Sequence, residues 1–142
     1  MDIVHYLQIN STIENVYHAI STSRGIASWW SLSASGHSEL GAILELDFGP
    51  GYQWQAQVTG MVSPTEFELI LTKADPDWID STVGFQLSGN QNLIDVRFYH
   101  KGWKEANDHY YTSCYCWAMY LRIMKRYVEH GETVDYHQRL DV

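Results

Sequence analysis

One histidine in this sequence stands where it could do chemistry. His100 ends an alternating run, residues 93–100, in which Val96 and Phe98 share its parity. Side chains on a strand point to opposite faces by turns, so the imidazole is predicted to face the same apolar side as these two residues. There it could orient a polar ligand group or move a proton, but a core histidine satisfied by a nearby hydroxyl or backbone group fits the same pattern. No second titratable residue shares that parity, so no catalytic pair is visible.

Large aromatic side chains are the second candidate for a site. Trp30, Trp54 and Trp117 fall on faces predicted to point inward, as does Tyr110. Their rings could form walls against which a flat or aliphatic ligand packs, although ordinary core packing explains the same pattern. Tryptophan and tyrosine carry polar groups that need partners when buried, which favours a mixed pocket. The predicted ligand-binding residues are Trp30, Trp54, Phe85, Phe98, His100, Tyr110, Trp117 and Leu121.

The usual signals of metal, nucleotide and hydrolase sites are missing from the sequence. Seven histidines are scattered without an i, i+4 pair, and Cys114 and Cys116 have no second ligand pair at zinc-site spacing. The two cysteines lie two apart in a predicted helix, where their sulfurs point to different sides, so both are expected to be reduced. No glycine-rich phosphate loop and no Gly-x-Ser-x-Gly elbow is present. We therefore expect no metal and no cofactor.

Charge and composition narrow the classes of partner. The formal net charge of −8 gives a field that repels phosphate backbones and anionic lipid surfaces, so nucleic acid is not an expected partner. No apolar run is long enough to span a bilayer, and the first residues lack the features of a secretory signal, so a cytoplasmic protein is expected. With 45% hydrophobic and 18% charged residues over 142 positions, the chain is predicted to fold as one domain, residues 1–142.

The hydrophobic period changes along the chain. Residues 3–9 alternate and are predicted as a first strand. Ser11 and Glu14 form a capping-box pattern that predicts a short helix to about Ser21, and a second short helix is predicted at residues 25–30. Each later strand alternates between apolar and polar residues, and short connections build antiparallel neighbours, so one face of the sheet should be apolar. These strands are predicted at residues 42–48, 52–62, 67–73, 81–87 and 93–100. They are separated by turn signals at residues 49–51, 63–64, 75–77 and 88–90.

A long amphipathic helix is predicted to cover that apolar face. Its stripe recurs at intervals of four and three, and Gly131 is a natural stop. The predicted fold class is therefore α+β, a curved antiparallel sheet of about six or seven strands wrapped around a long C-terminal helix, with two short helices after the first strand. Residues 132–142 form a charged tail that is either disordered or docked, through Tyr136 and Leu140, on the body or on a partner subunit. The stripe residues are Tyr110, Cys114, Trp117, Leu121, Met124 and Val128.

Several motifs give the chain a family resemblance. They are Ile26-Ala27-Ser28-Trp29-Trp30, Val96-Arg97-Phe98-Tyr99-His100 with Gly102-Trp103, and Cys116-Trp117-Ala118-Met119-Tyr120-Leu121 leading to Glu129-His130-Gly131. In order and spacing they resemble the START/SRPBCC superfamily, whose fold is called helix-grip, and more closely its branch named after the activator of Hsp90 ATPase homologues. The resemblance implies an elongated cavity between sheet and helix, which in the superfamily accepts lipids, sterols, polyketides and plant hormones. The branch also includes a co-chaperone domain.

Three functions follow as hypotheses. The leading one is non-enzymatic binding of a small hydrophobic or amphipathic molecule in the cavity. The alternatives are a cyclase- or hydrolase-type enzyme that uses His100 and a co-chaperone-like domain with a chaperone partner; a homodimer is also left open. Because residues 31–41 are rich in serine and glycine and show no periodicity, this segment, with Trp30 at its hinge, is predicted to be a mobile loop at the mouth of the cavity.

Overall fold

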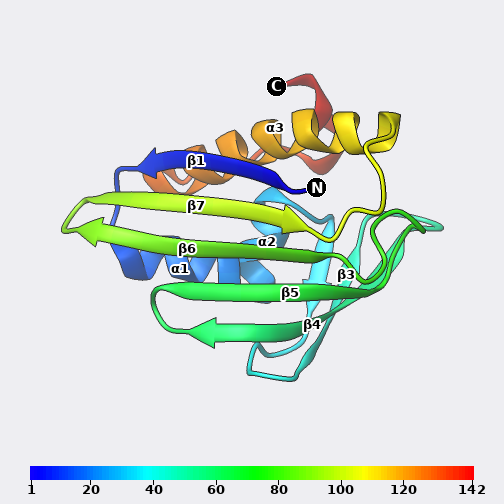
Figure 1. Ribbon diagram of the computed structural model, residues 1–142. Helices are drawn as coiled ribbons and strands as arrows, with labels where there is room; N and C mark the ends of the chain where they lie inside the picture. Colours follow the sequence, from blue (N-terminus) through cyan, green and yellow to red (C-terminus); the bar gives the residue numbers. More distant parts are fainter.

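Antiparallel pairing of chain neighbours builds nearly the whole sheet. The computed structural model describes residues 1–142, and its strands lie in the order β1-β7-β6-β5-β4-β3-β2. Strands β2 to β7 pair in chain order, whereas β1 pairs with β7 at one edge of the sheet (Figure 1). The elements are β1 (Ile3–Ile9), α1 (Ile13–Ser21), α2 (Ser23–Trp29), β2 (Ser33–Ser35), β3 (Ile43–Asp47), β4 (Gln53–Val62), β5 (Glu66–Lys73), β6 (Thr82–Asn90), β7 (Leu93–Lys101), α3 (Asp108–His130) and the 3-10 helix η1 (Tyr136–Asp141).

The helices cover one face of this sheet. α3 contacts α1, α2 and β1, and α1 also contacts β5 and β6. The predicted α+β helix-grip architecture is confirmed, including a seven-stranded antiparallel sheet, two short helices after the first strand and a long helix near the end of the chain. None of the helices is long and apolar enough to cross a membrane.

Alternation along the strands places the apolar side chains in one core. In β5, Phe67, Leu69 and Leu71 are buried, whereas the intervening Glu68 and Ile70 are only partly buried on the other face. Each fully buried side chain of this size contributes about 1.5–3 kcal/mol relative to an exposed one. A slip of one residue would expose this whole set, so the burial pattern also specifies the strand register. The predicted apolar face is confirmed, and Ile70 is an apolar residue of this strand that lies on the opposite face.

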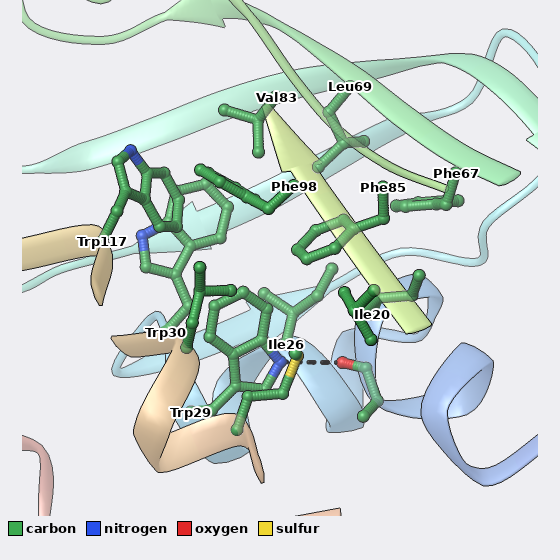
Figure 2. Packing of buried hydrophobic residues seen from close by; sticks show 14 of the residues in the cluster. Ile20, Ile26, Trp29, Trp30, Phe67, Leu69, Val83, Phe85, Phe98 and Trp117 are labelled. Atoms are coloured by element: carbon green, nitrogen blue, oxygen red, sulfur yellow. Dashed lines mark hydrogen bonds between the residues drawn. The ribbon is translucent and has the colours of Figure 1, made fainter. Parts of the chain in front are cut away.

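Figure 2 shows how α2 reaches this core. Trp29 packs edge-on against Phe85 of β6, with ring centroids 6.0 Å apart. Its indole N–H donates to the carbonyl oxygen of Ala19 in α1 over 2.9 Å, so the buried nitrogen is satisfied and the two helices are joined. Ile20 and Ile26 belong to the same buried cluster.

The start of α1 differs by one residue from the predicted capping box. Thr12 is the cap, and its hydroxyl accepts the backbone N–H of Asn15 over 3.2 Å. Ser11 instead accepts a hydrogen bond from the Asn15 side chain. Either hydroxyl residue can cap a helix, so two adjacent candidates leave the first turn ambiguous in sequence.

Two segments predicted as loop or turn contain strand. Ser33–Ser35 lies within the predicted loop and pairs with β3 as β2, which is too short to show alternation in sequence. The turn predicted at residues 88–90 lies inside β6, and the chain reverses instead at residues 91–92. Gly89 has a φ of 120°, which glycine adopts more readily than any other residue. Here glycine marks a local distortion of the strand and not its end.

The end of the chain is docked on the body. α3 stops at Gly131, whose φ of 67° is the left-handed conformation expected there. Met119 and Ile123 are buried although they lie off the predicted stripe. The reason is that α1, α2 and η1 also contact this helix and cover a second side of it.

A buried arginine holds the tail. The Arg139 guanidinium donates to the carbonyl oxygens of Ala27 and Ser31, each over 3.1 Å, and the residue is 5% exposed. A cation near the end of α2 is favourable because the last carbonyls of a helix carry partial negative charge. The Tyr136 hydroxyl adds a hydrogen bond to the backbone just after β3. Leu140, the other predicted anchor, is 69% exposed.

We predict that Gly25→Ala destabilises the protein although alanine is the better helix former. A Cβ at this position would lie 2.4 Å from the carbonyl oxygen of His18 and 2.7 Å from the backbone of Ala19, so α1 and α2 would have to separate. We expect the free energy of unfolding to fall by about 1–3 kcal/mol, the usual cost of overpacking. Urea denaturation measures this, and Ser28→Ala on the same helix is the control, with an expected change below about 0.5 kcal/mol. An unchanged or raised stability of G25A would contradict the close helix contact.

Candidate functional site

His100 lies in a buried chain of hydrogen bonds. It is 0% exposed, its Nδ1 accepts the indole N–H of Trp117 over 3.1 Å, and its Nε2 lies 2.7 Å from Ser81 Oγ. Because an indole can only donate, Nδ1 is unprotonated and Nε2 carries the hydrogen. The Ser81 hydroxyl in turn donates to the carbonyl oxygen of Trp78. Both ring nitrogens are therefore used, and the imidazole is held in one tautomer.

Burial sets the charge of this histidine. Desolvation, with a smaller contribution from nearby His109, lowers the pKa of His100 to about 3. The imidazole is therefore neutral over the whole physiological range. Of the two interpretations that the sequence left open for His100, these contacts match a core histidine satisfied by its neighbours.

A cavity of about 420 Å³ lies between the sheet and the first half of α3. Ten of its 14 lining residues are hydrophobic, so it offers mostly apolar surface to a ligand. The end of α2, the β3–β4 hairpin, the β5–β6 loop, α3 and η1 all contribute. The lining residues are Trp30, Phe48, Tyr52, Trp54, Asp75, Trp78, His109, Thr112, Ser113, Cys116, Trp117, Tyr120, Tyr136 and Leu140.

Trp78 occupies the centre of the cavity wall. It lies in the β5–β6 loop, is 8% exposed, and has its ring centroid 5.2 Å from that of Trp54, 5.6 Å from Trp117 and 6.4 Å from Trp30. Its indole Nε1 is buried and has no hydrogen-bond partner in the protein. Sequence reasoning missed this residue. A tryptophan directly after a predicted turn, residues 75–77, was a usable signal, because so large an apolar ring is seldom left exposed on a loop.

The structure divides the predicted ligand-binding residues into two groups. Trp30, Trp54 and Trp117 line the cavity. Phe85, Phe98 and His100 lie on the expected face of the sheet, but they are buried in the packed core and do not line the cavity. The Phe98 ring centroid, for example, is only 4.5 Å from that of Trp117. Alternation predicts which face of the sheet a side chain lies on. It does not predict at which positions along the strand the covering helix packs against that face and leaves no cavity. The residues outside the lining are Phe85, Phe98, His100, Tyr110 and Leu121.

The predicted position of the cavity mouth is wrong. No residue of the segment 31–41 lines the cavity, although the adjacent Trp30 does. β2 ties this segment to β3, and the Ser31 carbonyl accepts a hydrogen bond from Arg139, so the segment is fastened to the body outside the lining. The β3–β4 hairpin, the β5–β6 loop and η1 bound the cavity in its place.

Few charged or reactive side chains reach the cavity. His109 lines it but is engaged, because its Nδ1 lies 2.9 Å from Oδ2 of Asp77, a contact that lowers the pKa of that carboxyl. Burial raises the pKa of the Cys116 thiol, which therefore stays protonated at neutral pH. Asp75 is only partly buried, and its carboxylate makes no hydrogen bond or ion pair with the protein. No group of three or more His, Cys, Asp or Glu side chains is arranged to hold a metal ion.

Comparisons with known proteins agree with this fold. The family model described as Activator of Hsp90 ATPase homolog 1-like protein matches residues 10–129. The solution structure of the Aha1 dimer from Colwellia psychrerythraea is 26% identical over 93% of this chain and 98% of its own, with a TM-score of 0.83. A Staphylococcus saprophyticus protein (20% identity, 94% and 96% coverage, TM-score 0.77) and one from the dynemicin biosynthetic locus (18%, 94% and 50%, 0.78) share the fold. A comparison with curated proteins finds no match.

We predict that His100 makes the folded protein less stable in mild acid. Its folded-state pKa is about 3, whereas in the unfolded chain the imidazole takes up a proton near its ordinary pKa of 6.5. The unfolded state therefore binds more protons between these two values. The contribution of this imidazole to the free energy of unfolding is complete above pH 6.5 and is lost as the pH falls. The loss between pH 7 and pH 4.5 is roughly 2–3 kcal/mol.

Urea denaturation of the wild-type protein and of His100→Asn across this pH range measures the effect. Carboxylates titrate in both proteins, so the difference between the two slopes of the free energy of unfolding against pH isolates the contribution of the imidazole. H100N should be less stable at pH 7, because Trp117 and Ser81 lose their partner, yet less sensitive to acid. Equal slopes would rule out a neutral buried imidazole.

Proposed function

The chain belongs to the family of Activator of Hsp90 ATPase homolog 1-like proteins, and we propose that it binds a small, mostly hydrophobic molecule in the cavity between the sheet and α3. The observation that carries this proposal is the set of indole rings around the cavity, with Trp78 at its centre. Its volume of about 420 Å³ falls within the range of small-molecule sites, roughly 300–1,000 Å³. Walls made of aromatic rings favour a planar ligand, because stacking and edge contacts add to the gain from burial.

The residues of the site favour binding of the ligand without catalysis. His100 lies outside the lining with both ring nitrogens engaged, so it is not free to exchange a proton with a ligand. The Cys116 thiol is protonated and is therefore a weak nucleophile. We place the protein in the cytoplasm as part of the proposal, since Cys114 and Cys116 are free thiols.

A second candidate is a domain that works as a homodimer. The Colwellia relative is described as a dimer. β1 is an edge strand of the sheet, and its Val4 and Tyr6 are exposed by 62% and 54%. Sedimentation over a range of concentrations tests this candidate: a monomer mass throughout would remove it, whereas a dimer weakened by Val4→Lys would support it. The co-chaperone role rests on the family description alone.

We predict that the cavity binds the uncharged fluorescent probe N-phenyl-1-naphthylamine with a saturable rise in emission. Trp54→Leu should weaken binding by about tenfold, because an aromatic contact contributes about 0.5–1.5 kcal/mol beyond its buried area. Trp54 is only partly buried, so this variant is expected to fold.

Tyr115→Leu is the matched control for this experiment. The Tyr115 ring is 77% exposed on α3 and lies outside the lining, so its removal should leave probe binding unchanged. Circular dichroism and thermal unfolding establish that both variants are folded. Binding that does not saturate, or equal affinity of the two variants, would refute the proposed site.

A further inference from the structure

The charges that line the cavity are unbalanced. No lysine or arginine contributes to the lining. His109 is paired with Asp77 over 2.9 Å, which leaves the Asp75 carboxylate as the one charged lining group without a partner in the protein. We propose that the ligand is an organic cation, namely an amine or a quaternary ammonium compound with an apolar body. This inference rests on the proposed function.

Four aromatic side chains of the lining form a closed circuit of contacts. The ring centroid of Phe48 lies 5.4 Å from that of Trp30 and 4.9 Å from that of Trp54. The Trp78 ring completes the circuit, at 5.2 Å from Trp54 and 6.4 Å from Trp30. Neighbouring rings are inclined by 26° to 64°, so they form walls that meet at angles. Aromatic ring faces attract quaternary ammonium groups because they carry partial negative charge.

A single turn connects the residue that carries the carboxylate, Asp75, with one of these rings, Trp78. The backbone carbonyl of Asp75 accepts the N–H groups of Trp78, over 2.9 Å, and of Ile79, over 3.0 Å. The backbone between the carboxylate and the indole is therefore fixed. An ammonium group that lies against these rings loses part of its hydration, and a carboxylate at the lining offsets part of that loss.

The same features disfavour an anionic ligand. The net charge of −8 attracts cations and repels carboxylates and phosphates. Arg139 in η1 follows the cavity residue Tyr136, but its guanidinium is buried and donates to the carbonyl oxygens of Ala27 and Ser31. It is therefore not available to pair with a fatty acid or a phosphate group.

Displacement of N-phenyl-1-naphthylamine by three small aromatic compounds tests the charge preference. They are benzyltrimethylammonium, its uncharged carbon isostere neopentylbenzene, and the anion phenylacetate. At low ionic strength we expect benzyltrimethylammonium to displace the probe at roughly tenfold lower concentration than the isostere, with phenylacetate the weakest.

Asp75→Asn tests the carboxylate while keeping the size of the side chain. We expect benzyltrimethylammonium to bind this variant about three- to tenfold more weakly, and neopentylbenzene to bind it unchanged. Asp80→Asn is the matched control, because it removes the same charge from the same loop outside the lining. The Asp80 φ of 64° is a conformation that asparagine also adopts.

The outcomes separate this inference from the proposed function. Equal displacement by the cation and its isostere, or an unchanged response of D75N, overturns the cation preference and leaves hydrophobic binding standing. If N-phenyl-1-naphthylamine itself does not bind, the proposed function fails for neutral ligands, and calorimetric titration of benzyltrimethylammonium then decides. Binding that D75N weakens supports the cation site, and the absence of binding overturns it.

Discussion

The hydrogen bond from the Trp117 indole to His100 is the constraint on which the rest of the core depends. Trp117 is 1% exposed, and a buried indole N–H without an acceptor would cost about 1–3 kcal/mol. The acceptor is a neutral imidazole nitrogen, which requires the hydrogen to sit on the other nitrogen and to find an acceptor of its own. Ser81, directly before β6, meets that need. One side chain of α3 thus positions a group on β7 and a group directly before β6.

The same tryptophan divides the space beneath α3. Its ring packs on the core residue Phe98, and it also meets the cavity residues Trp30 at 5.0 Å and Trp78 at 5.6 Å between centroids. Trp78 also covers the imidazole of His100, with ring centroids 4.5 Å apart. These rings are at once the boundary of the core and the wall of the cavity. Stability and the proposed binding would therefore depend on the same residues, and a ligand in the cavity would contact the outer layer of the core.

Local periodicity was enough to predict all the strands except β2, the long helix and the apolar face, because alternation and helical spacing are properties of neighbouring residues. It did not locate the cavity. The two partners of His100 lie 17 and 19 positions away from it, and no local pattern couples them. Arg139 reached its acceptors through the docking of the tail, 108 and 112 positions from them. Trp78 sits in a loop without periodicity, so its large apolar ring was the only local signal of its burial, and its place in the cavity wall followed from the tertiary arrangement.

At Trp78, the contribution of a side chain to stability can be distinguished from its contribution to the cavity. Its buried Nε1 has no acceptor, and phenylalanine would keep much of the apolar area without that unpaired donor. Trp103 has the same unpaired nitrogen but does not line the cavity, so an unsatisfied indole does not by itself mark a site. Trp78 differs in its position, because its ring joins those of Trp54 and Trp30 along the cavity wall. We therefore attribute the indole at this position to the larger aromatic face that it would present to the proposed ligand.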